Sequence, residues 1–302
     1  MRTSEGDRAE TGPSARIQPE EHIPRFAILA ASWSPGSVRQ RAMRFGDDPH
    51  QGLIAFTPKK PQPGPWVFFL FGGDWTSGSA RLWSFAGNWF AHQGIPAVLG
   101  GYRLAPEHRF PAALDDTLAG FAFAFDHVDE LGVAGRPAVL SGASSGGHLA
   151  ALAAIQLARN AAVSRRADSR VRADGLLLVN APLDLPTAHT PKGVAAIEAL
   201  TGHARPWPEA DPITWVLAEP VSATAIPRTL VVQGEIDELV PPVVAEHFAE
   251  AFNRLSPGCA QIVHPAWNEH VDLTRLFLDR DPSLTEFVVN WLRTVVARPE
   301  IV

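Results

Sequence analysis

One segment near the middle of the chain constrains the fold more than any other. Residues 138–152 read AVLSGASSGGHLAAL, an apolar strand pattern, a short turn and an alanine-rich helical pattern. The turn has the form G-x-S-x-G, with Gly142 and Gly146 on either side of Ser144. Glycines allow a strand-to-helix turn so tight that Cβ atoms would clash, and such a turn exposes its central serine. We predict that Ser144 is a nucleophile beside a helix N-terminus, which favours developing negative charge.

The rest of the chain alternates between strand and helix patterns. Strands are predicted at residues 66–71, 95–100, 138–141, 175–180, 228–233 and 260–263. Helices are predicted at residues 112–128, 147–159, 242–255 and 283–296. Such alternation implies a mostly parallel sheet with helices on both faces, and catalytic groups at the carboxyl ends of its strands. Residues 38–45 and 52–57 are candidates for antiparallel edge strands.

The chain is expected to form one main domain. Residues 1–21 are polar and rich in charged side chains, which predicts a flexible N-terminal segment. Residues 22–302 contain no linker or repeat long enough to divide them, so a single domain is expected. Within it, residues 184–226 interrupt the alternation with several prolines. We predict that this excursion forms a small cap over the site.

Composition excludes several classes of partner. The net charge is −6 and no run of lysine or arginine occurs, so neither nucleic acid nor a membrane surface is an expected partner. No apolar run approaches the ~20 residues of a membrane span, and the N-terminus lacks the apolar core of a secretory signal. The single cysteine, Cys259, excludes an internal disulfide. A cytoplasmic location is expected, and the sequence leaves a homodimer open.

A serine nucleophile needs a base and an acid to activate it. Asp237 follows a predicted buried strand and a glycine, which suits an acid held on a loop, whereas Asp184 equally suits a turn or helix cap. His270 stands in a polar loop before the last helix, and from there it can project back over Ser144. His264 ends a strand and is interpreted as a rim residue. The preferred triad is therefore Ser144, Asp237 and His270.

Other histidines give no sign of metal chemistry. The spacing of His264, His270 and Asp272 matches no metal motif, so no metal is expected. His148, on the helix after the nucleophile, is interpreted as a packed or capping side chain. The predicted chemistry also needs no cofactor.

Two longer segments resemble a known family. Residues 102–116 read YRLAPEHRFPAALDD and residues 145–150 read SGGHLA. Both resemble the hormone-sensitive-lipase-like carboxylesterases of the α/β-hydrolase superfamily, over about residues 60–295. The resemblance implies the α/β-hydrolase fold, a mostly parallel central sheet flanked by helices and a small cap. It also implies hydrolysis of small carboxylic esters through an acyl-enzyme, with residues 102–116 in a structural role.

The loop expected to bind the oxyanion departs from the family pattern. The family has His-Gly-Gly-Gly, and this chain has Phe71-Gly72-Gly73-Asp74-Trp75. The resemblance implies an oxyanion hole built from backbone N–H groups of this loop and of the residue after the nucleophile. The residues assigned to it are Gly72, Gly73, Asp74 and Ser145. A carboxylate in the hole would repel the oxyanion, so we expect the Asp74 side chain to point away, onto its own loop.

The other substitution in this loop removes a hydrogen-bonding side chain. Phe71 cannot make the bonds of the family's histidine, so support for the loop must come from elsewhere. Trp75 is expected to line the substrate pocket, because it lies next to the loop in sequence. For Trp83, Trp89 and Phe90, lining a pocket and packing between helix and sheet remain equal alternatives.

Two further functions compete with ester hydrolysis. The pattern Gly-Gly-x-Trp also resembles kynurenine formamidases, so the same triad could cleave a formamide or another activated amide. A non-catalytic binding protein on this scaffold is the third hypothesis, which the altered oxyanion loop motivates and the intact triad opposes. The expected partner is a small-molecule ester or amide.

Overall fold

An eight-stranded sheet runs through the part of the chain that the structure describes. The computed structural model describes residues 38–163, 170–218, 221 and 223–295, so the predicted flexible segment 1–21 lies outside the described residues. The strand order is β1-β2-β4-β3-β5-β6-β7-β8. The strands are β1 (Val38–Arg44), β2 (Gly52–Pro58), β3 (Trp66–Leu70), β4 (Ala97–Gly100), β5 (Ala138–Ala143), β6 (Gly175–Val179), β7 (Arg228–Val232) and β8 (Ala260–Val263).

The pairing of the strands matches the prediction from hydrophobic runs. β1 pairs with β2 and β2 with β4 in antiparallel fashion, while every pair from β4 to β8 is parallel. All residues of β3, β4, β5 and β6 are buried, which explains why these strands have consecutive apolar residues rather than an alternating pattern. The expected mostly parallel sheet with antiparallel edge strands is confirmed.

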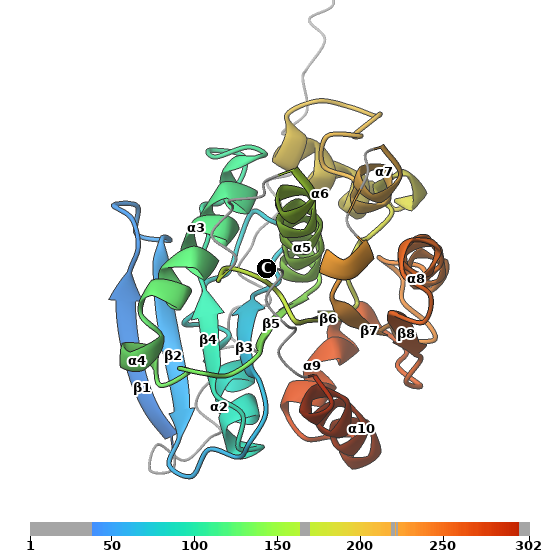
Figure 1. Ribbon diagram of the computed structural model, residues 1–302. Helices are drawn as coiled ribbons and strands as arrows, with labels where there is room; N and C mark the ends of the chain where they lie inside the picture. The colour runs from blue at the N-terminus through green and yellow to red at the C-terminus, as the bar shows by residue number, and fades with distance from the viewer. Residues whose placement is uncertain (1–37, 164–169, 219–220, 222, 296–302) are drawn as a thin grey trace, which may run out of the picture.

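Helices cover both faces of this sheet. Figure 1 shows α3, α5 and α8 on one side of the sheet and α2, α9 and α10 on the other. No helix within the described ranges is both long and apolar enough to cross a membrane. Among the described residues, the helices outside the excursion are α2 (Ser84–His92), α3 (Ala112–Asp126), α4 (Val128–Leu131), α5 (Ser145–Val163), α8 (Val243–Leu255), the 3₁₀ helix η4 (His270–Leu273), α9 (Thr274–Phe277) and α10 (Pro282–Arg293).

The sequence patterns did not predict helix α2. Seven consecutive residues, 85–91, are buried, so the helix shows no polar face and no amphipathic period. Trp83, Trp89 and Phe90 are buried here around Phe277, with ring centroids 5.6–6.4 Å from it. Of the two alternatives for these three aromatic residues, the structure shows packing in the core.

The described residues of the excursion at 184–226 form two α-helices and two short 3₁₀ helices. They are η2 (Leu185–Thr187), α6 (Pro191–Thr201), α7 (Pro212–Ala218) and η3 (Ala223–Ala225). Pro191 and Pro212 are the first residues of α6 and α7, where a missing N–H and a fixed φ favour helix initiation. The Thr190 hydroxyl also caps α6 by accepting a hydrogen bond from the Gly193 N–H at 3.0 Å.

Candidate active site

Ser144 lies in a strained turn between β5 and α5. Its φ is 51°, a left-handed conformation that is uncommon for a residue with a Cβ. A Cβ on Gly142 would come within 2.3 Å of the Gly146 backbone, and a Cβ on Gly146 within 2.2 Å of the Leu70 carbonyl oxygen. Both glycines are therefore required by close backbone packing. The Ser144 N–H donates to the Val179 carbonyl at 2.9 Å, which ties the turn to β6.

The imidazole of His270 joins Ser144 to Asp237. His270 Nε2 lies 2.8 Å from Ser144 Oγ, and His270 Nδ1 lies 2.8 Å from Asp237 Oδ2. Because the carboxylate can only accept, the Nδ1 position carries the proton and Nε2 faces the serine with its lone pair. All three residues are buried. The arrangement can therefore take a proton from the Ser144 hydroxyl.

Backbone amides fix the Asp237 carboxylate. The N–H groups of Leu239 and Val240 donate to Asp237 Oδ1 at 2.9 and 2.8 Å. The Gln233 side chain donates to Asp237 Oδ2 at 3.3 Å and to the Val240 carbonyl at 3.0 Å. With one oxygen held by amides, the other is directed at the imidazole.

Asn180 connects the loop that holds Asp237 to the loop that holds His270. It follows β6 and has φ of 44°, a conformation that asparagine tolerates better than most residues. Its Oδ1 accepts from the Gly234 N–H at 3.0 Å, and its Nδ2 donates to the His270 carbonyl at 3.3 Å. The His270 N–H donates to Glu238 at 2.8 Å, so both backbone groups of His270 are held. Sequence reasoning missed Asn180, which it treated only as the end of a strand.

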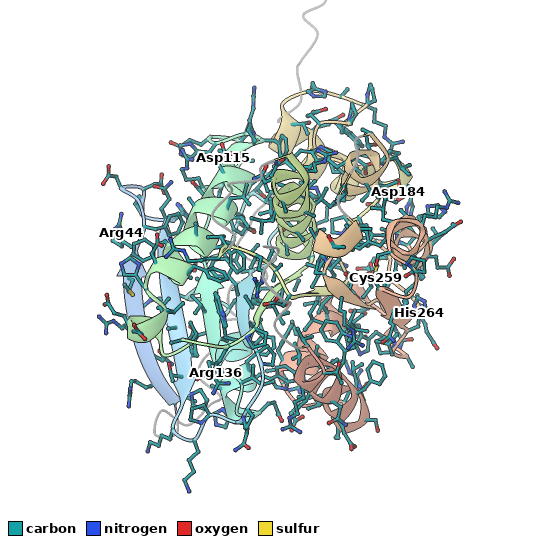
Figure 2. The ribbon with its side chains drawn as sticks, viewed as in Figure 1. Arg44, Asp115, Arg136, Asp184, Cys259 and His264 are labelled. Carbon is teal, nitrogen blue, oxygen red and sulfur yellow. The ribbon has the colours of Figure 1, made fainter. Side chains whose placement is uncertain are left out.

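The alternative acid and base lie elsewhere. Asp184 Oδ2 is 2.7 Å from Nδ1 of His247 on α8, and its backbone carbonyl accepts from the Thr187 hydroxyl. His264 is exposed, and its Nδ1 lies 2.9 Å from the Gln233 carbonyl oxygen. Figure 2 shows Asp184 and His264 on the side of the molecule near α8. Neither contacts Ser144. The described residues contain no group of three His, Cys, Asp or Glu side chains that could hold a metal.

The loop after β3 passes directly beside the nucleophile. A Cβ on Gly72 would come within 2.8 Å of the Ala143 carbonyl oxygen, and a Cβ on Gly73 within 2.1 Å of the Ser77 carbonyl oxygen. The Gly73 N–H is not free, because it donates to Ser145 Oγ at 3.0 Å. Among the described residues, no acceptor pairs with the N–H of Asp74 or the N–H of Ser145. These two amides are available to a ligand.

The family pattern has a histidine at the position of Phe71, and in this chain Tyr102 supports the loop instead. Its ring stacks on Phe71 with centroids 4.2 Å apart and an interplanar angle of 8°. Its hydroxyl donates to the Phe71 carbonyl at 2.8 Å, and burial raises the pKa of the phenol. The support that Phe71 cannot supply through its side chain therefore reaches its backbone from Tyr102.

A second support runs from Trp75 into the excursion. Trp75 Nε1 donates to His148 Nδ1 at 3.2 Å, and His148 Nε2 lies 2.7 Å from the Ala210 carbonyl oxygen. Burial lowers the pKa of His148 to about 4, so the ring is neutral and carries its proton on Nε2. His148 is a packed side chain, as the sequence suggests, and it links three segments of the chain.

The segment 102–116 is built around one ion pair. Arg103 donates to Asp116 through Nε at 2.8 Å and through a terminal nitrogen at 2.9 Å, and its backbone N–H donates at 2.8 Å. Gln51 also donates to Asp116, at 2.7 Å. Glu107 is exposed and His108 lies 3.6 Å from Asp48, so neither of these two side chains belongs to the site.

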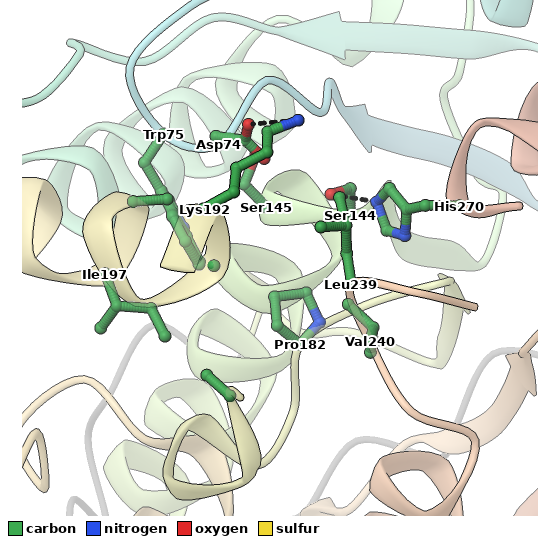
Figure 3. Close-up of a pocket in the computed structure, with 13 residues that line it drawn as sticks. Asp74, Trp75, Ser144, Ser145, Pro182, Lys192, Ile197, Leu239, Val240 and His270 are labelled. Carbon is green, nitrogen blue, oxygen red and sulfur yellow. Dashed lines mark hydrogen bonds and ion pairs between the residues drawn. The ribbon is translucent and has the colours of Figure 1, made fainter. Parts of the chain in front are cut away.

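A pocket opens over Ser144 and His270. Its volume, including space open to solvent, is about 420 Å³. Trp75 lies on its wall, and α6 of the excursion covers one side (Figure 3). Most of the lining is apolar, and it consists of Trp75, Pro182, Ala188, Gly193, Ala196, Ile197, Leu239 and Val240. The polar lining consists of Asp74, Ser144, Ser145, Lys192 and His270.

Comparison with known proteins identifies the family. The family model described as alpha/beta hydrolase fold matches residues 67–256, more than half of the chain. The chain belongs to this family. The match confirms the fold class, and the esterases among the relatives of this α/β hydrolase confirm its resemblance to the hormone-sensitive-lipase-like carboxylesterases.

Curated relatives match only part of their own length. Esterase LipC of Mycobacterium tuberculosis is 29% identical over 234 residues, which are 72% of this chain and 56% of that protein. Ethyl acetate hydrolase of Pseudomonas putida is 33% identical over 152 residues, which are 48% of this chain and 46% of that protein. This α/β hydrolase thus spans about half the length of these relatives.

Solved structures share the fold. Esterase B of Lactobacillus rhamnosis superposes with a TM-score of 0.72 and 21% identity, over 90% of this chain and 91% of that chain. A bacterial heroin esterase superposes with a TM-score of 0.69 and 22% identity, over 91% of this chain and 88% of that chain.

Proposed function

We propose that the protein is a serine hydrolase that cleaves small carboxylic esters. The observation that carries this proposal is the His270 imidazole, held 2.8 Å from Ser144 Oγ and 2.8 Å from Asp237 Oδ2. The curated relatives of this chain include an esterase and an ethyl acetate hydrolase, which supports ester substrates. The mainly apolar pocket suits a small uncharged acyl group.

The proposed reaction proceeds through an acyl-enzyme. His270 Nε2 takes the Ser144 proton as Oγ attacks the ester carbonyl carbon, and Asp237 stabilises the imidazolium. The carbonyl π bond opens to an oxyanion, which accepts hydrogen bonds from the N–H groups of Asp74 and Ser145. When the carbonyl re-forms, the alkoxide leaves with the proton from His270. Water then attacks the acyl group by the same steps and releases the acid.

The Gly73 N–H can belong to the proposed oxyanion hole only if it gives up its present hydrogen bond. It already donates to Ser145 Oγ at 3.0 Å. It can join the other two donors only when the Ser145 hydroxyl rotates away. Gly72, which the resemblance also assigns to the hole, packs against Ala143 at the start of the loop.

Kinetics on short esters test this function. We expect the wild type to hydrolyse p-nitrophenyl acetate and butyrate, and Ser144→Ala to lose that activity by a factor of about 10⁴ or more. Ser283→Ala, an exposed serine at the start of α10, is the matched control and should retain wild-type rates. Equal activity in Ser144→Ala and the wild type would refute the proposal. Faster turnover of N-formylkynurenine than of both esters would favour the formamidase function, which the comparisons do not favour.

Location and assembly extend the proposal. We propose a single domain over residues 22–302 with residues 184–226 as its cap, acting in the cytoplasm. The single cysteine supports a reducing compartment. Cell fractionation tests the location, and light scattering distinguishes a monomer from the homodimer that the sequence leaves open.

A further inference from the structure

A charged pair lies in the wall of the pocket. Asp74 Oδ2 on the oxyanion loop is 3.5 Å from Nζ of Lys192 on α6, as Figure 3 shows. Both residues line the same pocket as Ser144. The carboxylate thus pairs with a residue of the excursion, whereas the sequence suggested that it would turn onto its own loop.

Asp74 is an unexpected residue at this position. Its φ is 54°, where a residue with a Cβ is disfavoured, and the family pattern has glycine here. Its amide is a proposed oxyanion donor, so its carboxylate is carried by a residue that lies beside the developing negative charge. Two like charges in a partly desolvated pocket repel, and this repulsion would be greatest in the transition state.

An anionic partner would stabilise the Lys192 ammonium group at its position on α6. Lys192 is the second residue of α6, at the positive end of the helix dipole, where a cation is disfavoured. The chain has two other lysines, Lys59 and Lys60, and both are exposed in the segment that follows β2. The Asp74 carboxylate offsets both the dipole and the lysine charge, and the lysine in turn neutralises the carboxylate.

We propose that Lys192 is a positioning residue, which holds the Asp74 carboxylate away from the oxyanion hole and cancels its charge. This inference rests on the proposed esterase function. Lys192 acts through Asp74 and does not touch the reacting atoms. Because the repulsion it relieves grows as the oxyanion forms, its loss lowers kcat for an uncharged ester and leaves KM nearly unchanged.

A double-mutant cycle with p-nitrophenyl acetate at low ionic strength tests this role. We expect Lys192→Gln to lower kcat by roughly threefold to tenfold, since side chains that are 44% and 37% exposed are partly screened by water. The loss should shrink as salt is added. Lys192→Arg should restore most of kcat. In an Asp74→Asn background, Lys192→Gln should have little effect, because no charge remains to compensate.

Two controls separate the possible failures. Lys60→Gln removes an exposed lysine outside the pocket and should retain wild-type kcat at every salt concentration. Thermal melting shows whether each variant is folded. An unchanged kcat in Lys192→Gln, or an equal loss with and without Asp74→Asn, would overturn the role of Lys192. Absence of ester turnover in the folded wild type would instead refute the proposed function.

Discussion

At the scale of single residues, the proposed mechanism depends on which oxygen of which carboxylate faces His270. Asp237 Oδ2 accepts from the imidazole while Oδ1 accepts from two backbone amides. Asp237→Asn would place an amide group opposite Nδ1 and favour the wrong tautomer of the ring. We expect kcat for p-nitrophenyl acetate to fall by a factor of roughly 10⁴, with the fold intact by circular dichroism.

Asp184→Asn is the matched control for that substitution. Asp184 pairs with His247 at 2.7 Å and does not contact His270, so substantial activity should remain. If Asp184→Asn proved the more damaging of the two, the assignment of the acid would be wrong.

The buried His148 ring predicts a dependence of stability on pH. Burial lowers its pKa to about 4, from an ordinary value of 6.5. Between these values the unfolded chain binds more protons than the folded chain, so the stabilisation is complete above about pH 6.5 and is lost as pH falls toward 4. The loss should approach about 3 kcal/mol in the free energy of unfolding.

Urea unfolding at pH 7.5 and pH 5 measures this dependence. His148→Gln retains one donor and one acceptor for Ala210 and Trp75 but cannot titrate. Its stability should therefore change less between the two pH values than that of the wild type. Identical pH dependence in the two proteins would show that other groups control acid unfolding.

At the scale of elements, the segment after β7 and the segment after β8 must keep a fixed relative position for Asp237 to contact His270. Asn180, at the end of β6, bonds to both loops. Asn180→Asp keeps the acceptor for Gly234 but turns the donor into a second acceptor facing the His270 carbonyl. We expect the free energy of unfolding to fall by about 1–3 kcal/mol and kcat to fall about tenfold or more. Unchanged kcat in a destabilised variant would limit Asn180 to a structural role.

The regular elements could largely be predicted from sequence, because buried parallel strands have a distinctive run of apolar residues. The strands from β1 to β8 all fall within or beside the predicted ranges. Helix α2 could not, since its burial on all sides removes the helical period. α6 and α7 were hidden by prolines that begin helices rather than break them.

The residues of the candidate site fall into two groups: those that a local sequence pattern marks, and those that only contacts between distant segments reveal. Ser144, Asp237 and His270 follow β5, β7 and β8 in the chain order typical of this kind of triad. The local sequence pattern is therefore enough to predict them as candidates. Asn180 and Lys192 act through contacts between segments distant in sequence. No local pattern marks such contacts, and only the assembled fold shows them.

At the scale of the whole molecule, the Arg103–Asp116 pair joins the segment after β4 to α3 and to the loop before β2. Asp116 is 2% exposed and accepts four hydrogen bonds from Arg103 and Gln51. Asp116→Ala would leave a partly buried guanidinium without its partner. We expect the free energy of unfolding to fall by about 3–5 kcal/mol, measured by urea titration. Asp115→Ala, at a more exposed neighbour, should cost far less; equal losses would contradict the special role of the pair.

The central claim, that this fold activates Ser144 as a nucleophile, has a direct test. A fluorophosphonate probe forms a covalent bond only with an activated serine, and peptide mass spectrometry locates the adduct. We predict a single adduct on Ser144 in the folded wild type, and none in Ser144→Ala. A folded wild-type protein that stays unlabelled, or an adduct on another serine, would contradict the account.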